Sequence, residues 1–139
     1  HNYPTPEQLA SAGENALREI GLGYRAKFLV DTARCVADNE IHLTQLRTAS
    51  YDDALASLLM LNGVGDKVAN CILLFALDKP SAFPVDTWIQ KMLQQWYLGQ
   101  RKTGLKQMRI WAQDYFGQHA GYANQYIFHS GRIENTRSI

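Results

Sequence analysis

The sequence LNGVGDKVANC, from Leu61 to Cys71, determines how the rest of the chain is interpreted. Two glycines flank a valine between one apolar segment that ends near Met60 and another that begins near Asp66. Glycine tolerates positive φ angles and lets another backbone come close. The pattern therefore predicts two helices joined by a tight hairpin within residues 51–77, and the second helix would point its unpaired N–H groups outward.

Such a hairpin is suited to holding a phosphate. A helix N-terminus combines unpaired N–H donors with the positive end of the helix dipole. The backbone of Gly63, Val64 and Gly65 could then bind a nucleic-acid strand without reading its sequence. A simple corner between two helices, whose glycines serve only the turn, fits the same residues. Neither interpretation by itself implies an enzyme.

The remaining pattern predicts an all-α chain that forms one domain of 139 residues. Thr5, followed by Pro6 and Gln8, has the form of a capping box, while Ser50 and Asp86 each precede a helical pattern. The predicted helices cover about 6–20 with a break at Gly13, 25–38, 51–60, 66–77, 86–98, 105–116 and 120–130. Helical spacing predicts two buried faces, formed by Ala54, Leu55, Leu58 and Leu59 and by Val68, Ile72, Phe75 and Ala76.

Composition excludes several classes of protein. Apolar residues make up 46% of the chain, yet no run approaches the roughly 18 residues that a membrane span needs. The only two cysteines, Cys35 and Cys71, are far apart, which favours reduced thiols over a disulfide framework. We therefore expect a cytoplasmic or nuclear protein that does not bind membranes.

The charge is distributed unevenly. Residues 1–65 carry eight acids and five bases, a net of −3, whereas residues 66–139 carry five acids and nine bases, a net of +4. No acid lies between Asp86 and Asp114, where five bases occur: Lys91, Arg101, Lys102, Lys106 and Arg109. Such a basic segment favours a polyanionic partner, although a solvated surface of uneven charge explains it equally well.

Lys67 and Asp86 are the candidates for catalysis. Lys67 could simply touch a phosphate, or it could act as a nucleophile. A nucleophilic amine must be neutral, and both partial burial and a nearby helix N-terminus disfavour the ammonium form. Asp86 is placed to cap a helix, and an ionised carboxylate there could also stabilise a cationic transition state.

At this point the residues resemble a known family. The segment LNGVGDKVANCILLFALDKPSAFPVD (61–86), together with GLGYRAKF (21–28) and AGYANQYIF (120–128), is similar to the helix–hairpin–helix (HhH-GPD) DNA glycosylases. The 8-oxoguanine DNA glycosylase/AP lyase branch is the most similar. The resemblance covers nearly all of residues 1–139 and implies the family's helical domain without its N-terminal β domain. We therefore expect a fragment of a longer protein, or a catalytic half that a partner chain completes.

The resemblance also implies roles for individual residues. Lys67 matches the lysine that attacks C1′ and forms a Schiff base, and Asp86 matches the aspartate that supports the oxocarbenium-like transition state. Cys71 and Phe128 match the residues on the two faces of the flipped base. Asn124 stands where the family has the glutamine that reads the base edge.

Further implied roles concern DNA and a cation. Tyr24 matches the residue that wedges into the gap left by the extruded base, and Arg25 matches the arginine that reads the orphaned cytosine. Without the family, both would be ordinary surface residues. No cofactor is implied apart from a monovalent or similar cation at the hairpin, held by the main-chain carbonyls of Leu59, Leu61 and Val64.

Three departures accompany the resemblance. Asparagine at 124 is one methylene shorter than the family's glutamine, so either the pocket is tighter or Gln125 substitutes for it. Trp88 stands where many relatives have histidine, and the four-cysteine iron–sulfur loop of the endonuclease III-like branch is absent from the sequence.

The function expected from these residues is a monomeric, bifunctional DNA glycosylase/AP lyase for an oxidised purine in double-stranded DNA. Two alternatives are a non-catalytic helix–hairpin–helix DNA-binding module and a monofunctional glycosylase for alkylated bases. The presence of Lys67 speaks against the second alternative, because the resemblance implies that those enzymes lack the hairpin lysine.

Overall fold

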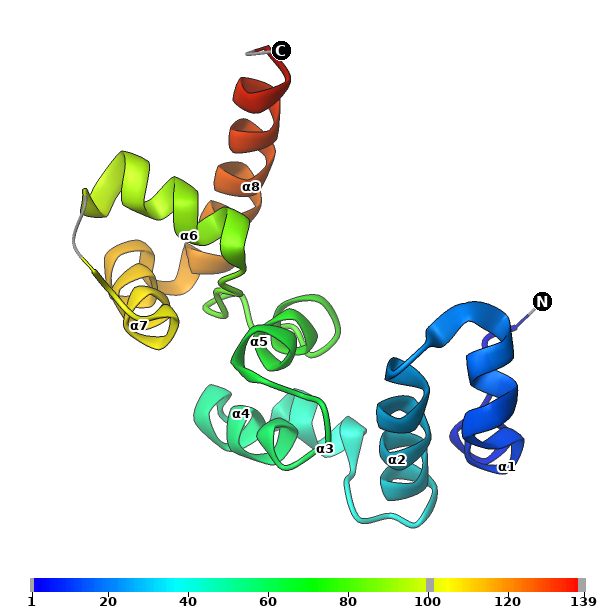
Figure 1. The fold of residues 1–139 in the computed structure, drawn as a ribbon. Helices are drawn as coiled ribbons and strands as arrows, with labels where there is room; N and C mark the ends of the chain where they lie inside the picture. Colours follow the sequence, from blue (N-terminus) through cyan, green and yellow to red (C-terminus); the bar gives the residue numbers. More distant parts are fainter. Residues whose placement is uncertain (1, 100–101, 138–139) are drawn as a thin grey trace. The chain divides into compact units, whose positions relative to one another are not determined.

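The computed structural model describes residues 2–99 and 102–137, and for residues 134–137 it describes the backbone alone. The described residues form helices and loops and contain no strand, which confirms the all-α prediction (Figure 1). None of these helices is both long enough and apolar enough to cross a membrane. The chain divides into two compact units, His1–Val64 and Gly65–Ile139.

The first unit begins with two helices that pack against each other. Helix α1 (Pro6–Leu17) starts with the predicted capping box on Thr5, and Gly13, with a φ of 76°, kinks it. A π-helical turn, η1 (Arg18–Leu22), leads to α2 (Arg25–Ala37). The two helices enclose a small apolar core of Leu9, Leu17, Ala26, Val30 and Ala33.

Two more helices complete this unit. Helix α3 (Leu43–Thr48) was not predicted, because it is short and its N-cap residue, His42, makes no capping hydrogen bond. Helix α4 (Tyr51–Leu59) begins as predicted, where the Ser50 side chain accepts a hydrogen bond from the N–H of Asp53. Its predicted buried face is confirmed except at Leu59, which is exposed.

The second unit surrounds a larger core. It contains α5 (Asp66–Phe75), α6 (Thr87–Leu93), the π-helical turn η2 (Gln94–Leu98), α7 (Leu105–Phe116), the 3-10 turn η3 (Gly117–His119) and α8 (Ala120–Arg137). Helices α6, α7 and α8 (green-yellow, yellow and orange-red in Figure 1) share this core with the loop before α6. Its buried residues are Phe83, Val85, Ile89, Met92, Leu93, Met108, Ala112, Ala120 and Ile127.

Helix α5 buries a different face from the one predicted. Val68, Phe75 and Ala76 are exposed, and the buried residues are Ala69, Asn70 and Leu73. The helix is apolar on more than one side, so periodicity alone could not decide which side faces inward. Asn70 lies on the buried face, where its amide donates a hydrogen bond to the Asp66 carbonyl 2.8 Å away within the same helix.

Candidate functional site

Lys67 lies in the first turn of α5. The N-cap is Gly65, whose backbone is extended, and the Ala69 N–H donates to the Gly65 carbonyl to start the helix. The Lys67 side chain is exposed, so the partial burial that we expected was wrong for this chain. A side chain in the first turn of a helix has no earlier turn of the same helix to pack against. The Lys67 amine accordingly lies in solvent.

Asp66, the acid that precedes Lys67 in sequence, forms an ion pair with Arg109. Arg109 Nε lies 3.0 Å and 3.1 Å from the two carboxylate oxygens of Asp66. Arg109 is only 5% exposed, so it was wrong to count it in the basic surface segment. Arg101, another member of that segment, lies outside the described residues. Lys91, Lys102 and Lys106 are exposed, as a basic surface requires.

Two further hydrogen bonds extend this ion pair to the loop before α6. Arg109 Nη1 donates to Gln113 Oε1 at 2.8 Å, and Gln113 Nε2 donates to the Ser81 carbonyl at 2.9 Å. The start of α5, helix α7 and the loop that leads to Asp86 are therefore joined by one chain of polar contacts. Sequence reasoning missed this role because it treated Arg109 as surface charge.

Asp86 caps α6 as predicted. Its Oδ1 accepts a hydrogen bond of 2.7 Å from the Ile89 N–H, and the residue is half-buried. The residues before it, Phe83, Pro84 and Val85, are buried in the unit. Asp86 Oδ1 is thus held in one place at the end of a packed loop.

Asn124 also acts on this loop. It is 3% exposed, and its Nδ2 donates to the Pro84 carbonyl at 2.8 Å. Its Oδ1 accepts a hydrogen bond of 3.2 Å from Gln125 Nε2. Both ends of the Asn124 amide are therefore occupied by protein groups, whereas Gln125 itself is exposed.

The other predicted pocket residues occupy different environments. Cys71 is a half-buried free thiol one helical turn after Lys67, so the two share a face of α5. Phe128 is half-buried, packs against the core of the second unit and carries the Arg132 guanidinium 5.7 Å from its ring centroid. The Trp88 indole N–H is buried, and no described residue accepts its hydrogen bond.

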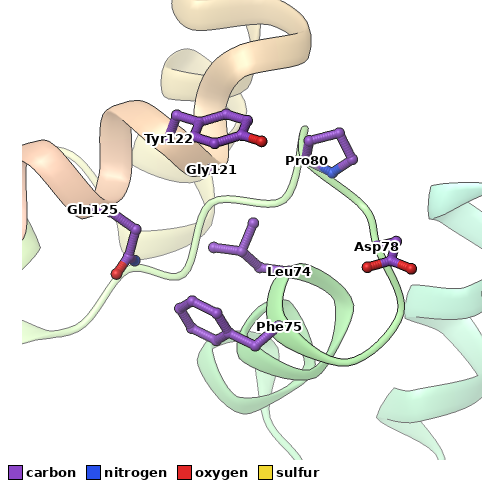
Figure 2. Close-up of a pocket in the computed structure, with 7 residues that line it drawn as sticks. All are labelled: Leu74, Phe75, Asp78, Pro80, Gly121, Tyr122 and Gln125. Atoms are coloured by element: carbon purple, nitrogen blue, oxygen red, sulfur yellow. The ribbon is translucent and has the colours of Figure 1, made fainter.

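A pocket of about 380 Å³ opens between α5, the following loop and the start of α8. Figure 2 shows Leu74 and Phe75 of α5 on one side and Tyr122 and Gln125 of α8 on the other. Asp78, Pro80 and Gly121 complete the lining. The pocket begins one helical turn beyond Cys71, and neither Cys71 nor Lys67 lines it.

In the first unit, the predicted wedge residue Tyr24 and the predicted orphan-base reader Arg25 follow a bend at Gly23. Gly23 has a φ of 57°, and Tyr24 and Arg25 come directly after it. Tyr24 is 63% exposed, and the Arg25 guanidinium lies over its ring at 4.8 Å. The Tyr24 ring meets Phe28 edge-on, with centroids 6.1 Å apart. Both side chains are thus presented to solvent from one end of α2.

The two hairpin glycines have different roles. Gly63 has a φ of 81°, and a Cβ at this position would lie 2.4 Å from the Phe28 ring. A Cβ on Gly65 would meet no atom within 4 Å. Gly63 is therefore needed to fold the turn, whereas Gly65 leaves open space at the start of α5.

The predicted cation ligands lie on the first-unit side of this turn. The Leu61 carbonyl accepts a hydrogen bond of 3.1 Å from the Val64 N–H. A carbonyl oxygen has two lone pairs, so this bond leaves one available. A cation held by the carbonyls of Leu59, Leu61 and Val64 stays a prediction.

Comparison with known proteins identifies the family. Residues 1–115 match the HhH-GPD superfamily base excision DNA repair protein family. The chain belongs to the HhH-GPD superfamily. It is 34% identical to a probable N-glycosylase/DNA lyase of Methanothermobacter thermautotrophicus, covering 95% of this chain and 48% of the relative. It is 35% identical to the N-glycosylase/DNA lyase OGG1 of Arabidopsis thaliana, covering 92% and 38%.

A solved structure of the same superfamily has nearly the same fold. It is the Clostridium acetobutylicum 8-oxoguanine glycosylase/lyase in complex with double-stranded DNA containing cytosine opposite 8-oxoguanine. The TM-score is 0.92 at 35% identity, covering 97% of this chain and 46% of that chain. This HhH-GPD chain therefore spans less than half the length of these three relatives.

A second pocket of this HhH-GPD chain, of about 360 Å³, lies within the first unit. Cys35, Glu40, His42, Gln45 and Ser57 are among the residues that line it. A hydrogen bond to the Glu40 carboxylate raises the pKa of the Cys35 thiol above its usual value, and desolvation adds to this effect. The thiol is therefore held in its protonated and less reactive form.

Proposed function

We propose that the protein is a bifunctional DNA glycosylase/AP lyase that removes an oxidised purine, 8-oxoguanine opposite cytosine, from double-stranded DNA. Membership of the HhH-GPD superfamily and similarity to two N-glycosylase/DNA lyases support the reaction class. The DNA bound in the Clostridium acetobutylicum structure suggests the lesion.

In the proposed reaction, the neutral Lys67 amine forms a bond to C1′ of the damaged nucleotide. The glycosidic bond breaks, and the base leaves with the bonding electrons and takes up a proton. The sugar ring then opens to a Schiff base on the Lys67 nitrogen. Loss of a proton from C2′ expels the 3′ phosphate by β-elimination and nicks the strand.

The observation that carries this proposal is the environment of the Lys67 amine. The adjacent carboxylate, Asp66, is bound by Arg109, and Lys67 makes no ion pair with any residue that the structure describes. A lysine whose role was to neutralise a neighbouring acid would be paired. This one is exposed at the start of α5 and available to a substrate.

Asp86 would supply the charge that this chemistry needs. A carbon losing its base develops positive charge, which a fixed anion stabilises without having to reorganise. Its hydrogen bond to the Ile89 N–H keeps Oδ1 in place, and Asn124 holds the carbonyl of Pro84 two residues earlier. The loop is thus braced before DNA binds.

The remaining residues would bind and open the duplex. A base inside a duplex must be extruded before it can be removed. The exposed Tyr24 is available to enter the resulting gap, and Arg25 beside it is available to contact the orphaned cytosine. Gly65 and the free N–H groups of α5 would hold a phosphate. The Lys67 side chain is exposed to water in the free chain. DNA bound over it would displace that water.

Trapping with borohydride tests this function. A duplex with 8-oxoguanine opposite cytosine should give a covalent protein–DNA adduct, which Lys67→Gln abolishes. Lys27→Gln, which removes an exposed lysine of the first unit, should trap normally. Lesion-independent, salt-sensitive binding without an adduct would instead identify a DNA-binding module. Base release that leaves intact abasic strands would identify a monofunctional enzyme.

A further inference from the structure

The tip of the hairpin turn, Asn62 and Gly63, is held against α2 at two points. Asn62 Nδ2 donates a hydrogen bond of 2.7 Å to the Asp31 carboxylate. Gly63 lies so close to the Phe28 ring that a Cβ on this glycine would be 2.4 Å from Cγ of the ring. A hydrogen bond to a charged group is stronger than one between neutral groups. The two contacts together fix the position of the turn along α2.

The same face of α2 carries Tyr24, the residue proposed to enter the gap left by an extruded base. Tyr24, Phe28 and Asp31 are spaced by four and three residues, so they follow one face of the helix. The Tyr24 and Phe28 rings meet at an interplanar angle of 82° with centroids 6.1 Å apart, which is a favourable edge-to-face arrangement. Phe28 therefore contacts both the hairpin turn and Tyr24.

We propose that Phe28 is a positioning residue for extrusion of the damaged nucleotide, and that the Asp31–Asn62 hydrogen bond supports it. Phe28 fixes the Tyr24 ring relative to the backbone of Gly63, which belongs to the hairpin proposed to hold a phosphate of the same DNA. Neither Phe28 nor Asp31 touches the base. This inference rests on the proposed glycosylase function.

A restrained ring lowers the free-energy cost of extrusion. Unpairing and unstacking a base cost free energy, which protein contacts in the opened duplex must offset. A side chain that rotates freely in the free protein loses rotamer entropy when it enters the duplex, and that loss adds to the cost. The Tyr24 ring is already restrained by Phe28 and by the Arg25 guanidinium, 4.8 Å from its centroid. Loss of the Phe28 contact should therefore slow extrusion and leave the later chemistry unchanged.

Variants of Phe28 test this role. Phe28→Leu keeps apolar bulk against Gly63 but removes the ring contact with Tyr24, whereas Phe28→Tyr keeps the ring. Phe28→Leu should lower single-turnover excision of 8-oxoguanine opposite cytosine by about 3- to 10-fold, the effect of losing one aromatic contact. Phe28→Tyr should excise at nearly the rate of the unaltered protein. Nicking at a preformed abasic site, which has no base to unstack, should be unchanged in both variants.

Variants of Asp31 test the supporting hydrogen bond. Asp31→Ala removes the acceptor for Asn62 and should also slow excision, whereas Asp31→Asn keeps an oxygen that can accept and should restore the rate. Thr32→Ala, which changes the next residue of α2 and is also half-buried, is the matched control and should change nothing.

Extrusion itself can be followed by the fluorescence of a 2-aminopurine placed next to 8-oxoguanine. Its rise on protein binding reports unstacking and should be slower in Phe28→Leu and in Asp31→Ala than in the unaltered protein.

Two results would overturn the inference. One is that Phe28→Leu and Asp31→Ala unstack the duplex and excise 8-oxoguanine as fast as the unaltered protein. The other is that these variants lose thermal stability and lose excision and abasic-site nicking equally, which would make the contacts merely structural. Failure of the unaltered protein to nick at an abasic site would instead overturn the proposed lyase function.

Discussion

The Nε of Arg109 lies between the two carboxylate oxygens of Asp66, 3.0 Å and 3.1 Å away, with the arginine side chain almost entirely buried. This pair joins α7 to the first turn of α5. The Asp66 carboxylate therefore pairs with Arg109 and not with Lys67, its neighbour in sequence. This buried ion pair fixes the start of α5 against α7, whatever its net effect on stability.

Removing the aspartate of this pair is expected to lower the free energy of unfolding more than removing the arginine. Asp66→Asn removes the negative charge that faces the buried Arg109 guanidinium, and we expect the free energy of unfolding to fall by about 3 kcal/mol. Arg109→Met should cost less, because Asp66 is one-third exposed and water can solvate it. Urea unfolding of both variants measures this difference, and equal or reversed costs would contradict it.

The hairpin glycines should separate folding from DNA binding. Gly63→Ala forces a side chain into a positive φ and against Phe28, which should cost about 2 kcal/mol or more. Gly65→Ala has open space and should leave stability within about 0.5 kcal/mol. The added methyl group should nevertheless weaken duplex binding, as measured by fluorescence anisotropy. Undiminished affinity would show that no phosphate approaches Gly65.

Asp86 can be tested without loss of the helix cap. Asparagine caps helices about as well as aspartate, so Asp86→Asn should unfold at nearly the same denaturant concentration. Loss of the anion should slow base release by about 100-fold or more while duplex binding survives. Equal losses of binding and base release would mean that Asp86 acts mainly as a cap.

The Cys35 thiol should react slowly because Glu40 raises its pKa. At a given pH above neutrality, a raised pKa leaves less thiolate, so alkylation by iodoacetamide is slowed. Glu40→Gln removes the carboxylate and should speed alkylation of Cys35, with Cys71 as the internal reference. Peptide mass spectrometry distinguishes the two cysteines, and an unchanged Cys35 rate would exclude this effect of Glu40.

Local sequence signals predicted most helix boundaries, and the reason is visible in the caps. Thr5, Ser50 and Asp86 each make the capping hydrogen bond expected of them. Helix α3 was missed because it has no such cap. These signals act within a few residues, so a sequence displays them directly.

The rotation of α5 and the burial of Arg109 could not be predicted from such local signals. Val68 and Phe75 are as apolar as the residues that α5 buries, and only tertiary contacts decide between its faces. The partner of Arg109 is forty-three residues away in sequence, so its charge looked like surface charge. The same holds for Asn124, whose bond to Pro84 spans forty residues.

The most direct test of the central claim is to identify the amine that bonds to DNA. The adduct reduced by borohydride on an 8-oxoguanine duplex can be digested and its modified peptide mapped by mass spectrometry. The account predicts a single modified residue, Lys67. An adduct on any other amine, or none from a protein that nonetheless nicks the strand, would contradict it.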